Sequence, residues 1–248
     1  MSSSTTYSVI GCGEFGSVAA KYLAPLNSEV LVFDKDAAAK TPQNARRVGY
    51  TAAIGADIII LAVPYDAYDS VLPVLAQNSP TDSLIVDVCS VKMKPTESFQ
   101  EHGLLERPNV LMTHPLFGPQ STVDGVEGKN IVITQQAGNL AETLLDSWRQ
   151  KGINFKPLSA EGHDREIAKV HALTFFVGRA LLEMGVEPSP LNTPYYSELL
   201  DLVEVEHHHS PELFYTIQRH NPFAREVREA FMAKLRELEA RIDQPYPN

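Results

Sequence analysis

The chain has few cysteines, no long apolar run and a deficit of basic residues, and each shortage excludes a class of protein. Two cysteines among 248 residues cannot form the disulfide framework of a small secreted domain. The longest apolar run, Ile58 to Val63, is far shorter than the roughly 20 residues that a membrane-spanning helix needs. Lys and Arg number 21 against 31 Asp and Glu, and the resulting net charge of -10 gives no general attraction to nucleic acid or anionic lipid.

What remains is an ordinary globular composition. Hydrophobic residues make up 44% of the chain and charged residues 21%, which excludes disorder, collagen and coiled coil. The length suits one large domain or two modest ones. The segment Met1 to Thr6 has neither the basic region nor the apolar core of a secretory signal, so we expect a cytoplasmic protein.

The first part of the chain alternates short apolar runs with helical stretches. The predicted strands are Val9–Ile10, Val30–Phe33, Ile58–Val63, Leu84–Val88, Val110–Met112, Ile131–Ile133 and Ile153–Phe155. Helices are expected between them, for example over Ser17–Ala24 and Leu140–Gln150. Continuous apolar strands that alternate with helices are typical of a parallel sheet covered on both faces. The pattern therefore predicts an α/β domain.

The pattern changes after about Leu158, where no further strand is indicated. Apolar residues recur at helical spacing over His163–Met184, Leu199–Val205 and Phe223–Ile242. We therefore predict two domains, an α/β domain over residues 1–156 and an all-helical domain over residues 157–248.

A glycine-rich loop lies between the first predicted strand and the first predicted helix. Gly11 permits a tight turn, Gly13 lets the backbone approach a pyrophosphate, and Gly16 allows close helix–strand packing. The pyrophosphate would lie at the positive end of the following helix. Asp34 ends the next strand, and with it the loop predicts a Rossmann-type dinucleotide-binding domain. The alternative is a structural turn without a ligand.

The acidic residue also indicates which dinucleotide binds. The Asp34 carboxylate would accept hydrogen bonds from the adenosine ribose and repel a 2′-phosphate, which favours NAD over NADP. The adjacent Lys35 weakens this preference slightly.

Two further polar residues follow predicted strands. Ser90 lies after Leu84–Val88, where ligands bind in open α/β sheets, and its alternative role is that of an N-cap for the next helix. His114 follows Val110–Met112, and histidine is the side chain best suited to proton transfer near neutral pH. A histidine at a strand end is alternatively structural or merely exposed.

These motifs together resemble those of the prephenate/arogenate dehydrogenase family, and they look most like the motifs of its plant arogenate-type branch. The resemblance runs from about Tyr7 to Ile242. It rests on the glycine loop, Ala62-Val63-Pro64, Ser90-Val91-Lys92 and His114-Pro115-Leu116-Phe117-Gly118-Pro119, and continues in Glu161-Gly162-His163-Asp164, Asn192-Thr193-Pro194 and Leu199-Leu200-Asp201-Leu202-Val203-Glu204. The pairing of the serine and histidine motifs at this spacing is the specific part of the signal.

The resemblance implies oxidation of a cyclohexadienol during tyrosine biosynthesis. Hydride leaves the carbinol carbon for NAD, the ring carboxylate leaves as carbon dioxide, and the ring becomes aromatic. His114 would be the base for the ring hydroxyl, and Ser90 would hold that hydroxyl. Further cofactor-binding residues are expected at Glu14, Phe15, Ala62, Val63, Pro64 and Cys89, and further substrate-binding residues at Gln120 and His209. It also implies a homodimer whose helical domains interleave.

The chain departs from the family at the position where many members carry an arginine that pairs with a substrate carboxylate. The matching stretch, Val205 to Pro211, contains three histidines and no arginine. Candidate cations are Lys92, Arg165, Arg179, Arg219 and His209. Adjacent loop histidines rarely converge on one ion, so no metal site is expected.

The identity of the substrate depends on the same stretch. Plant arogenate-type members place an acid where this chain has His209, which favours prephenate as substrate. Glu206 or Glu212 is an alternative acid and would favour arogenate. A third possibility is a binding protein that kept the NAD site and lost catalysis.

Overall fold

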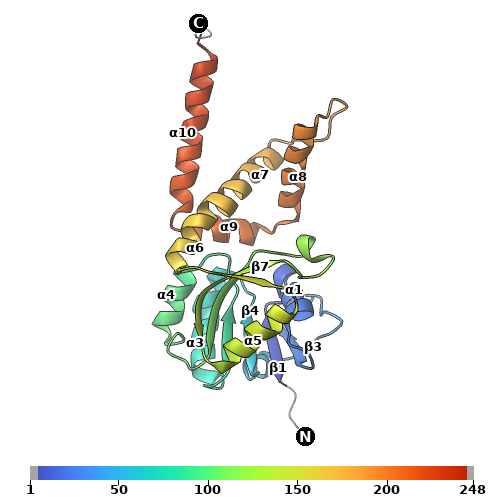
Figure 1. Cartoon of the computed structure of the whole chain (residues 1–248), viewed down its shortest axis with the longest axis vertical. Coiled ribbons are helices and arrows are strands. Elements are labelled where there is room, and N and C mark those ends of the chain that lie inside the picture. The colour runs from blue at the N-terminus through green and yellow to red at the C-terminus, as the bar shows by residue number, and fades with distance from the viewer. Residues whose placement is uncertain (1–4, 245–248) are drawn as a thin grey trace. The chain divides into compact units, whose positions relative to one another are not determined.

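The computed structural model describes residues 5–244, and the chain divides between His163 and Asp164 into two compact units. We call them the α/β unit and the helical unit and describe each by itself (Figure 1). The division lies within α6 (Ala160–Ile167), whereas the sequence placed the boundary after residue 156, inside β8 (Asn154–Pro157). A strand that pairs with the sheet belongs to the α/β unit, and the helical pattern only begins after it.

The α/β unit is built on one sheet, which has eight strands among the described residues in the order β3-β2-β1-β4-β5-β6-β7-β8. In chain order the strands are β1 (Thr6–Ile10), β2 (Glu29–Phe33), β3 (Arg46–Arg47), β4 (Ile58–Leu61), β5 (Leu84–Asp87), β6 (Val110–Pro115), β7 (Asn130–Ala137) and β8. The first six strands have the order of a Rossmann fold. The predicted Rossmann-type domain is confirmed.

Helices cover both faces of this sheet, as its continuously apolar central strands require. They are α1 (Glu14–Val18), α2 (Tyr50–Ile54), α3 (Tyr68–Asn78), α4 (Met93–Glu101) and α5 (Asn139–Gln150), with the π-helical turn η1 (Ala19–Leu23) and the 3₁₀ turns η2 (Tyr65–Ala67) and η3 (Gln120–Thr122). One hydrophobic cluster joins α1, η1 and α5 to the sheet, and another joins α2, α3 and α4 to it. The central strands are therefore buried on both sides.

The sheet is not wholly parallel, and here the prediction was wrong. Strand β7 pairs antiparallel with β6, with a register shift between Met112 and Thr113, while the other strand pairs are parallel. A parallel pair needs a long crossover, usually a helix. The connection from β6 to β7 contains only the short turn η3, so the chain returns beside β6 in the opposite direction.

The parallel strands bring the predicted site residues to one edge of the sheet. Strands β1, β2, β4, β5 and β6 run the same way, so their carboxyl ends meet there. The strand order reverses between β1 and β4, which is where ligands bind in open α/β sheets.

The helical unit contains the end of α6, the π-helical turn η4 (Ala168–Ala172), α7 (Leu173–Glu183), α8 (Pro194–His208), α9 (Pro211–His220) and α10 (Ala224–Ile242). Helices α8 and α9 each begin with an N-cap side chain and a proline, since Thr193 Oγ1 accepts from Tyr196 N and Ser210 Oγ from Leu213 N. Between residues 5 and 244, no helix is both long and apolar enough to span a membrane.

Candidate active site

The glycine loop after β1 can be built only with glycine at two positions. Gly11 has a φ of 93°, and a Cβ there would lie 2.3 Å from the carbonyl oxygen of Ala62. A Cβ on Gly16 would lie 1.9 Å from the carbonyl oxygen of Gly11. The loop is therefore pressed against Ala62, directly after β4, and against the start of its own helix.

Gly13 has the opposite environment, because a Cβ there would meet nothing within 4 Å. The residue is exposed, and α1 begins directly after it at Glu14. Phe15 packs beside the ring of Phe117, with 6.2 Å between the ring centroids. The loop thus leaves an open approach to the backbone at the start of a helix, which fits the pyrophosphate of a dinucleotide.

Asp34 follows β2 and points its carboxylate at the same loop. Its Oδ2 accepts a hydrogen bond from Cys12 N at 2.6 Å, and its Oδ1 accepts one from Asp36 N at 2.8 Å. Each carboxylate oxygen can accept a further bond. The side chain is therefore fixed at the loop and still able to accept hydrogen bonds from ribose hydroxyls. Lys35 beside it is exposed.

The ends of β4 and β5 contribute the next group of predicted residues. Ala62 and Val63 are half-buried after β4 and Pro64 is exposed, while Cys89 is buried and Ser90 is half-buried after β5. Ser90 is not the N-cap of the following helix, because α4 begins at Met93 with Lys92 as its N-cap. The alternative role for Ser90 was wrong, which leaves it available at the sheet edge.

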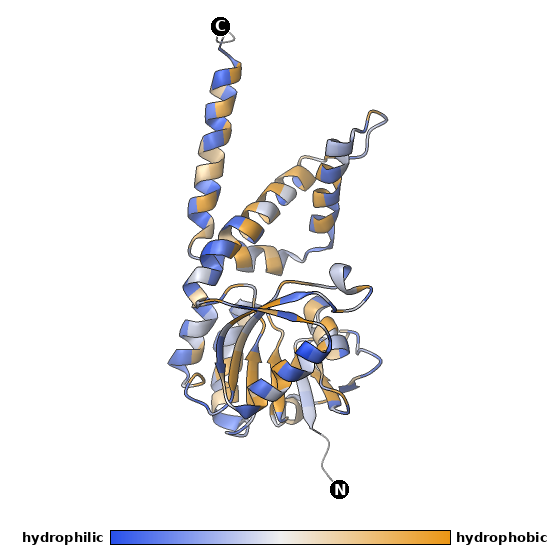
Figure 2. Ribbon diagram, viewed as in Figure 1, coloured by the Kyte–Doolittle hydropathy of each residue, from blue (hydrophilic) through white to orange (hydrophobic). Residues whose placement is uncertain are grey.

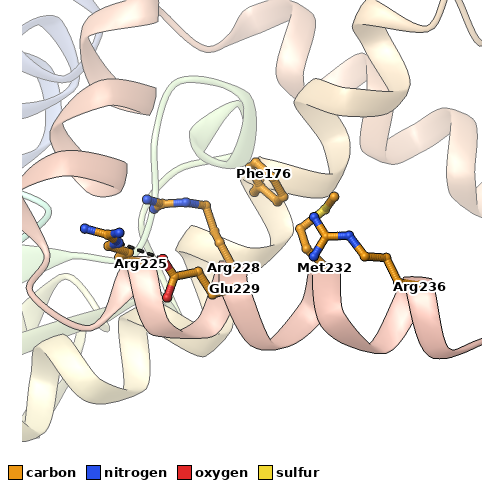
Figure 3. Close-up of a pocket in the computed structure, with 6 residues that line it drawn as sticks. All are labelled: Phe176, Arg225, Arg228, Glu229, Met232 and Arg236. Carbon is orange, nitrogen blue, oxygen red and sulfur yellow. Dashed lines mark hydrogen bonds and ion pairs between the residues drawn. The ribbon is translucent and has the colours of Figure 1, made fainter.

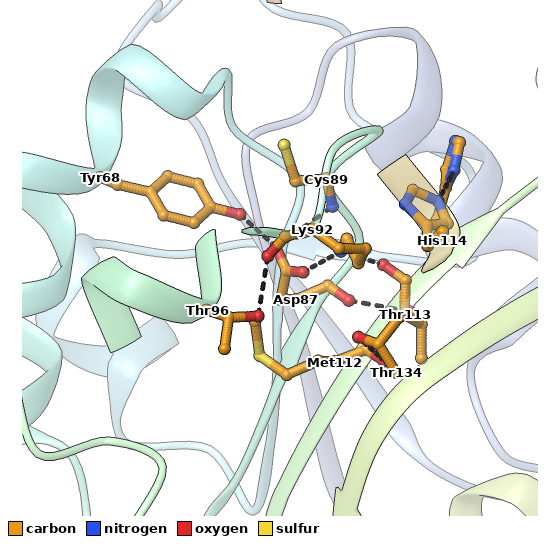
Figure 4. Close-up of polar contacts among 10 residues, drawn as sticks. Tyr68, Asp87, Cys89, Lys92, Thr96, Met112, Thr113, His114 and Thr134 are labelled. Atoms are coloured by element: carbon orange, nitrogen blue, oxygen red, sulfur yellow. Dashed lines mark hydrogen bonds and ion pairs between the residues drawn. The ribbon is translucent and has the colours of Figure 1, made fainter. Parts of the chain in front are cut away.

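A buried ion pair lies between the ends of β5 and β6. Lys92 and Asp87 are both fully buried, and Lys92 Nζ donates to an Asp87 carboxylate oxygen and to the carbonyl oxygen of Thr113 (Figure 4). Thr113 Oγ1 in turn donates to Asp87 O at 2.8 Å. Lys92 was a candidate cation for the substrate, and this expectation was wrong because its ammonium is enclosed beneath the site.

Tyr68 of α3 completes this network. Its hydroxyl donates to Asp87 Oδ1, and Cys89 N donates to the same oxygen at 3.2 Å. Burial, and then the neighbouring Asp87 carboxylate, raises the pKa of the Tyr68 phenol well above its usual value. The phenol therefore remains a hydrogen-bond donor at neutral pH. The network holds Thr113, the residue before His114, against β5.

His114 lies at the end of β6 and is 4% exposed. Its Nδ1 is hydrogen bonded to Nε2 of His163, at 2.8 Å, and the two rings meet edge to face with 5.0 Å between centroids. His163 is fully buried on α6. The sequence named this residue only as part of the resemblance, and the contact joins positions 49 residues apart, which no local spacing reveals.

His209, a predicted substrate-binding residue, caps the C-terminus of α8 in the helical unit. Its Nδ1 is 3.2 Å from an oxygen of the buried Glu206, and its ring centroid lies 4.4 Å from that of Phe175. Arg179 Nε lies 3.4 Å from the other Glu206 oxygen. Arg179 and His209, two of the candidate cations, are thus brought together on a buried carboxylate.

The remaining candidates are placed separately. Arg165 lies over the ring of Phe223 and Arg219 over that of Tyr215, at 4.2 and 4.1 Å from the centroids. Gln120 is exposed in η3 of the α/β unit. Among residues 5–244 there is no cluster of three or more histidine, cysteine or carboxylate side chains that could hold a metal ion.

The α/β unit matches a known family. The model for the nucleotide-binding domain of prephenate dehydrogenase matches residues 20–149, which is more than half of the chain. The chain belongs to the prephenate dehydrogenase family. The matched residues include Ser90 and His114 but begin after the glycine loop. The assignment of the loop therefore depends on its geometry and not on this match. Residues 180–246 match a second model, that of the TYRAAT1-like C-terminal domain.

Curated relatives of this prephenate dehydrogenase family member include two chloroplastic enzymes of Arabidopsis thaliana. Arogenate dehydrogenase 2 is 35% identical over 77% of this chain and 56% of its own length. Arogenate dehydrogenase 1 is 28% identical over 94% of this chain and 38% of its own length. The chain therefore spans about half the length of the curated relatives it matches.

A solved structure of the family shares the fold. Prephenate dehydrogenase from A. aeolicus, in complex with hydroxyphenyl propionate and NAD+, superposes with a TM-score of 0.74 at 18% identity, over 97% of this chain and 91% of that one. The α/β domain followed by a helical region is thus a family architecture.

Proposed function

We propose that the chain is an NAD-dependent dehydrogenase that oxidises prephenate to 4-hydroxyphenylpyruvate and carbon dioxide. The observation that carries this proposal is the meeting, at one sheet edge, of a dinucleotide cradle, Ser90 and the buried histidine His114. A glycine turn with only a structural role would not require Ser90 and a buried histidine at the same edge of the sheet. Family membership supports the same reaction.

The cradle fits NAD in three respects. The backbone at Gly13 is open, a helix begins directly after it, and Asp34 keeps acceptor capacity for ribose hydroxyls. When bound, NAD supplies the hydride acceptor. Ala62, Val63, Pro64 and Cys89 would line the cofactor from the ends of β4 and β5, with Glu14, Phe15 and Lys35 beside the loop and Asp34.

His114 and Ser90 would act on the substrate hydroxyl. His114 accepts the hydroxyl proton as the carbinol carbon gives up hydride, and Ser90 holds the hydroxyl by a hydrogen bond. Loss of the ring carboxylate as carbon dioxide leaves its electron pair in the ring, which becomes an aromatic phenolate, and the proton on His114 returns to the phenolate oxygen to give the 4-hydroxyphenyl product. The chain therefore needs to supply only a base, a hydrogen bond and the correct placement of two ligands.

The test is the rise in NADH absorbance when the protein is mixed with NAD and either prephenate or arogenate. We expect turnover, with a higher kcat/KM for prephenate. A higher kcat/KM for arogenate would overturn the prephenate assignment and keep the reaction. Tight NAD binding without turnover of either substrate would instead support the binding protein that has lost catalysis.

Arogenate is the second candidate, and the contacts of His209 favour it. An ammonium that is removed from water needs a carboxylate or another acceptor nearby. Glu206, in the last turn of α8, lies against His209, so a carboxylate is present beside the position where plant arogenate-type members carry an acid. The carboxylate also faces Arg179, which neutralises it, and on this ground we retain prephenate.

Asp34→Ala should weaken NAD and relax discrimination against NADP. Loss of hydrogen bonds to a charged acceptor raises the Kd for NAD by about 10- to 100-fold. Removal of the carboxylate also removes its repulsion of a 2′-phosphate. Fluorescence titration with both cofactors measures the ratio of the Kd for NADP to the Kd for NAD. The matched control is Asp36→Ala, which removes an exposed carboxylate two positions further along the chain. An unchanged ratio in Asp34→Ala would show that Asp34 does not contact the ribose.

The proposal includes a homodimer formed through the helical unit. The hydrophobic cluster that this unit buries among the described residues is small, with Ala172, Phe175, Ile217 and Ala224 at its centre and Leu213 and Phe214 packed against it. Helix α10 alternates polar and apolar residues (Figure 2), and its apolar stripe, Leu235, Leu238 and Ile242, is exposed. A groove of about 320 Å³ adjoins it, lined by Phe176 of α7 and Arg225, Arg228, Glu229, Met232 and Arg236 of α10 (Figure 3). A second copy would cover this surface.

Leu238→Asp should convert the dimer to a monomer at micromolar concentration, because it would place a charge in the apolar stripe that the second copy covers. Sedimentation velocity measures the change. Ala240→Asp introduces the same charge on the opposite face of α10 and should leave a dimer. A wild-type protein that sediments as a monomer would refute the homodimer.

A further inference from the structure

His163 is a buried titratable residue with no role in the function proposed so far. It is fully buried on α6, and its Nε2 lies 2.8 Å from Nδ1 of His114. The two rings are nearly perpendicular, at 75°, so the edge of one histidine faces the other. The contact therefore acts on Nδ1 of His114, and Nε2 is the nitrogen to which we assign proton abstraction.

A neutral imidazole carries its single proton on one of its two nitrogens, and only the other nitrogen can accept a proton. The partner of Nδ1 therefore decides whether Nε2 is a base. If Nδ1 carries the proton, Nε2 keeps its lone pair for the substrate hydroxyl. If Nε2 carries the proton, it has no lone pair with which to accept the proton of the substrate hydroxyl.

We propose that His163 is a positioning residue that accepts the Nδ1–H of His114 and so keeps Nε2 of His114 unprotonated. This inference rests on the proposed function, since it names the group that prepares His114 for its role. For His163 it requires a lone pair on Nε2 and the proton on Nδ1. The reverse direction, with His163 donating to His114, would disable the base.

The same contact stabilises His114 after it has accepted the substrate proton. The imidazolium then has an N–H on both nitrogens, and its Nδ1–H still points at Nε2 of His163. A hydrogen bond from a charged donor is shorter and about twice as strong as a neutral one. Because both rings are buried, water does not compete freely for this bond. His163 therefore favours the charged form of His114 that develops during the reaction.

Two variants of His163 separate its hydrogen bond from its packing. In His163→Gln, the amide oxygen can take the place of Nε2 and accept from His114, whereas His163→Leu fills the space without an acceptor. We expect His163→Leu to lower kcat by about 10- to 100-fold, as for loss of a hydrogen bond to a charged group, with little change in KM. His163→Gln should recover most of this loss. His102→Gln, at the C-cap of α4, is the control for a histidine-to-glutamine change.

The tautomer of His114 provides a readout that needs neither substrate nor cofactor. Nitrogen-15 NMR of histidine-labelled protein distinguishes protonated from bare ring nitrogens, and His114→Asn identifies the His114 signals. We expect Nδ1 protonated and Nε2 bare in the wild-type protein, and loss of this preference in His163→Leu. A wild-type spectrum with Nε2 protonated overturns the inference without use of any variant.

Failure of this inference and failure of the proposed function give different results. Wild-type turnover together with an unchanged kcat in His163→Leu overturns the inference and keeps the dehydrogenase. Absence of turnover with either substrate overturns the dehydrogenase, while the NMR result still tests whether His163 sets the tautomer.

Discussion

Replacement of His114 by asparagine should lower kcat by about 10²- to 10⁴-fold, the usual effect of losing a general base. The asparagine amide nitrogen can occupy the place of Nδ1 and still donate to His163, so the packing of the two side chains is largely kept. No group remains at the place of Nε2 to accept the hydroxyl proton. Steady-state kinetics with saturating NAD and the preferred substrate measures the loss.

Cofactor binding separates loss of the base from damage to the site. We expect the Kd for NAD in His114→Asn to stay within about twofold of wild type, since the cradle is built from β1, β2 and β4. Ser90→Ala removes a hydrogen bond and not the base, so its kcat should fall by about 10-fold or less. A near-normal rate in His114→Asn would exclude His114 from the chemistry.

The fold was predictable where burial leaves a mark on the sequence. Ile58–Leu61 is apolar at every position because both faces of β4 are covered, and this pattern is visible in one sequence. Strand β3 was missed because it consists of Arg46 and Arg47, which pair with the edge of β2 and bury little. Helix α9 was also missed, although Ser210 and Pro211 are a typical helix start.

The site was predictable to the extent that strand ends carry it. The residues placed at the sheet edge lie at the end of a strand or within a few residues after it, so the order of the strands brings them together. His163 and the enclosure of Lys92 could not be found this way, since both depend on contacts between distant segments. From the sequence alone, Lys92 is a cation that could bind an anionic ligand. Only its burial against Asp87 reveals a structural role.

Lys92→Met should be among the most destabilising single changes in the α/β unit. Methionine fills most of the space of the lysine stem but leaves the Asp87 carboxylate without its cation in a fully buried place. Removal of one partner from a buried ion pair costs about 3–5 kcal/mol, because the remaining charge is not compensated. The free energy of unfolding, from urea titration followed by circular dichroism, measures the effect.

The double variant Asp87→Asn/Lys92→Met tests whether the unpaired charge is the cause. The asparagine amide is neutral, and its oxygen can still accept hydrogen bonds from the Tyr68 hydroxyl and from Cys89 N, as Asp87 Oδ1 does. The double variant should therefore unfold at a higher urea concentration than Lys92→Met alone. If the two unfold together, the loss comes instead from the donor to Thr113 O that both variants lack, and the lysine acts by holding the strand of His114 in place.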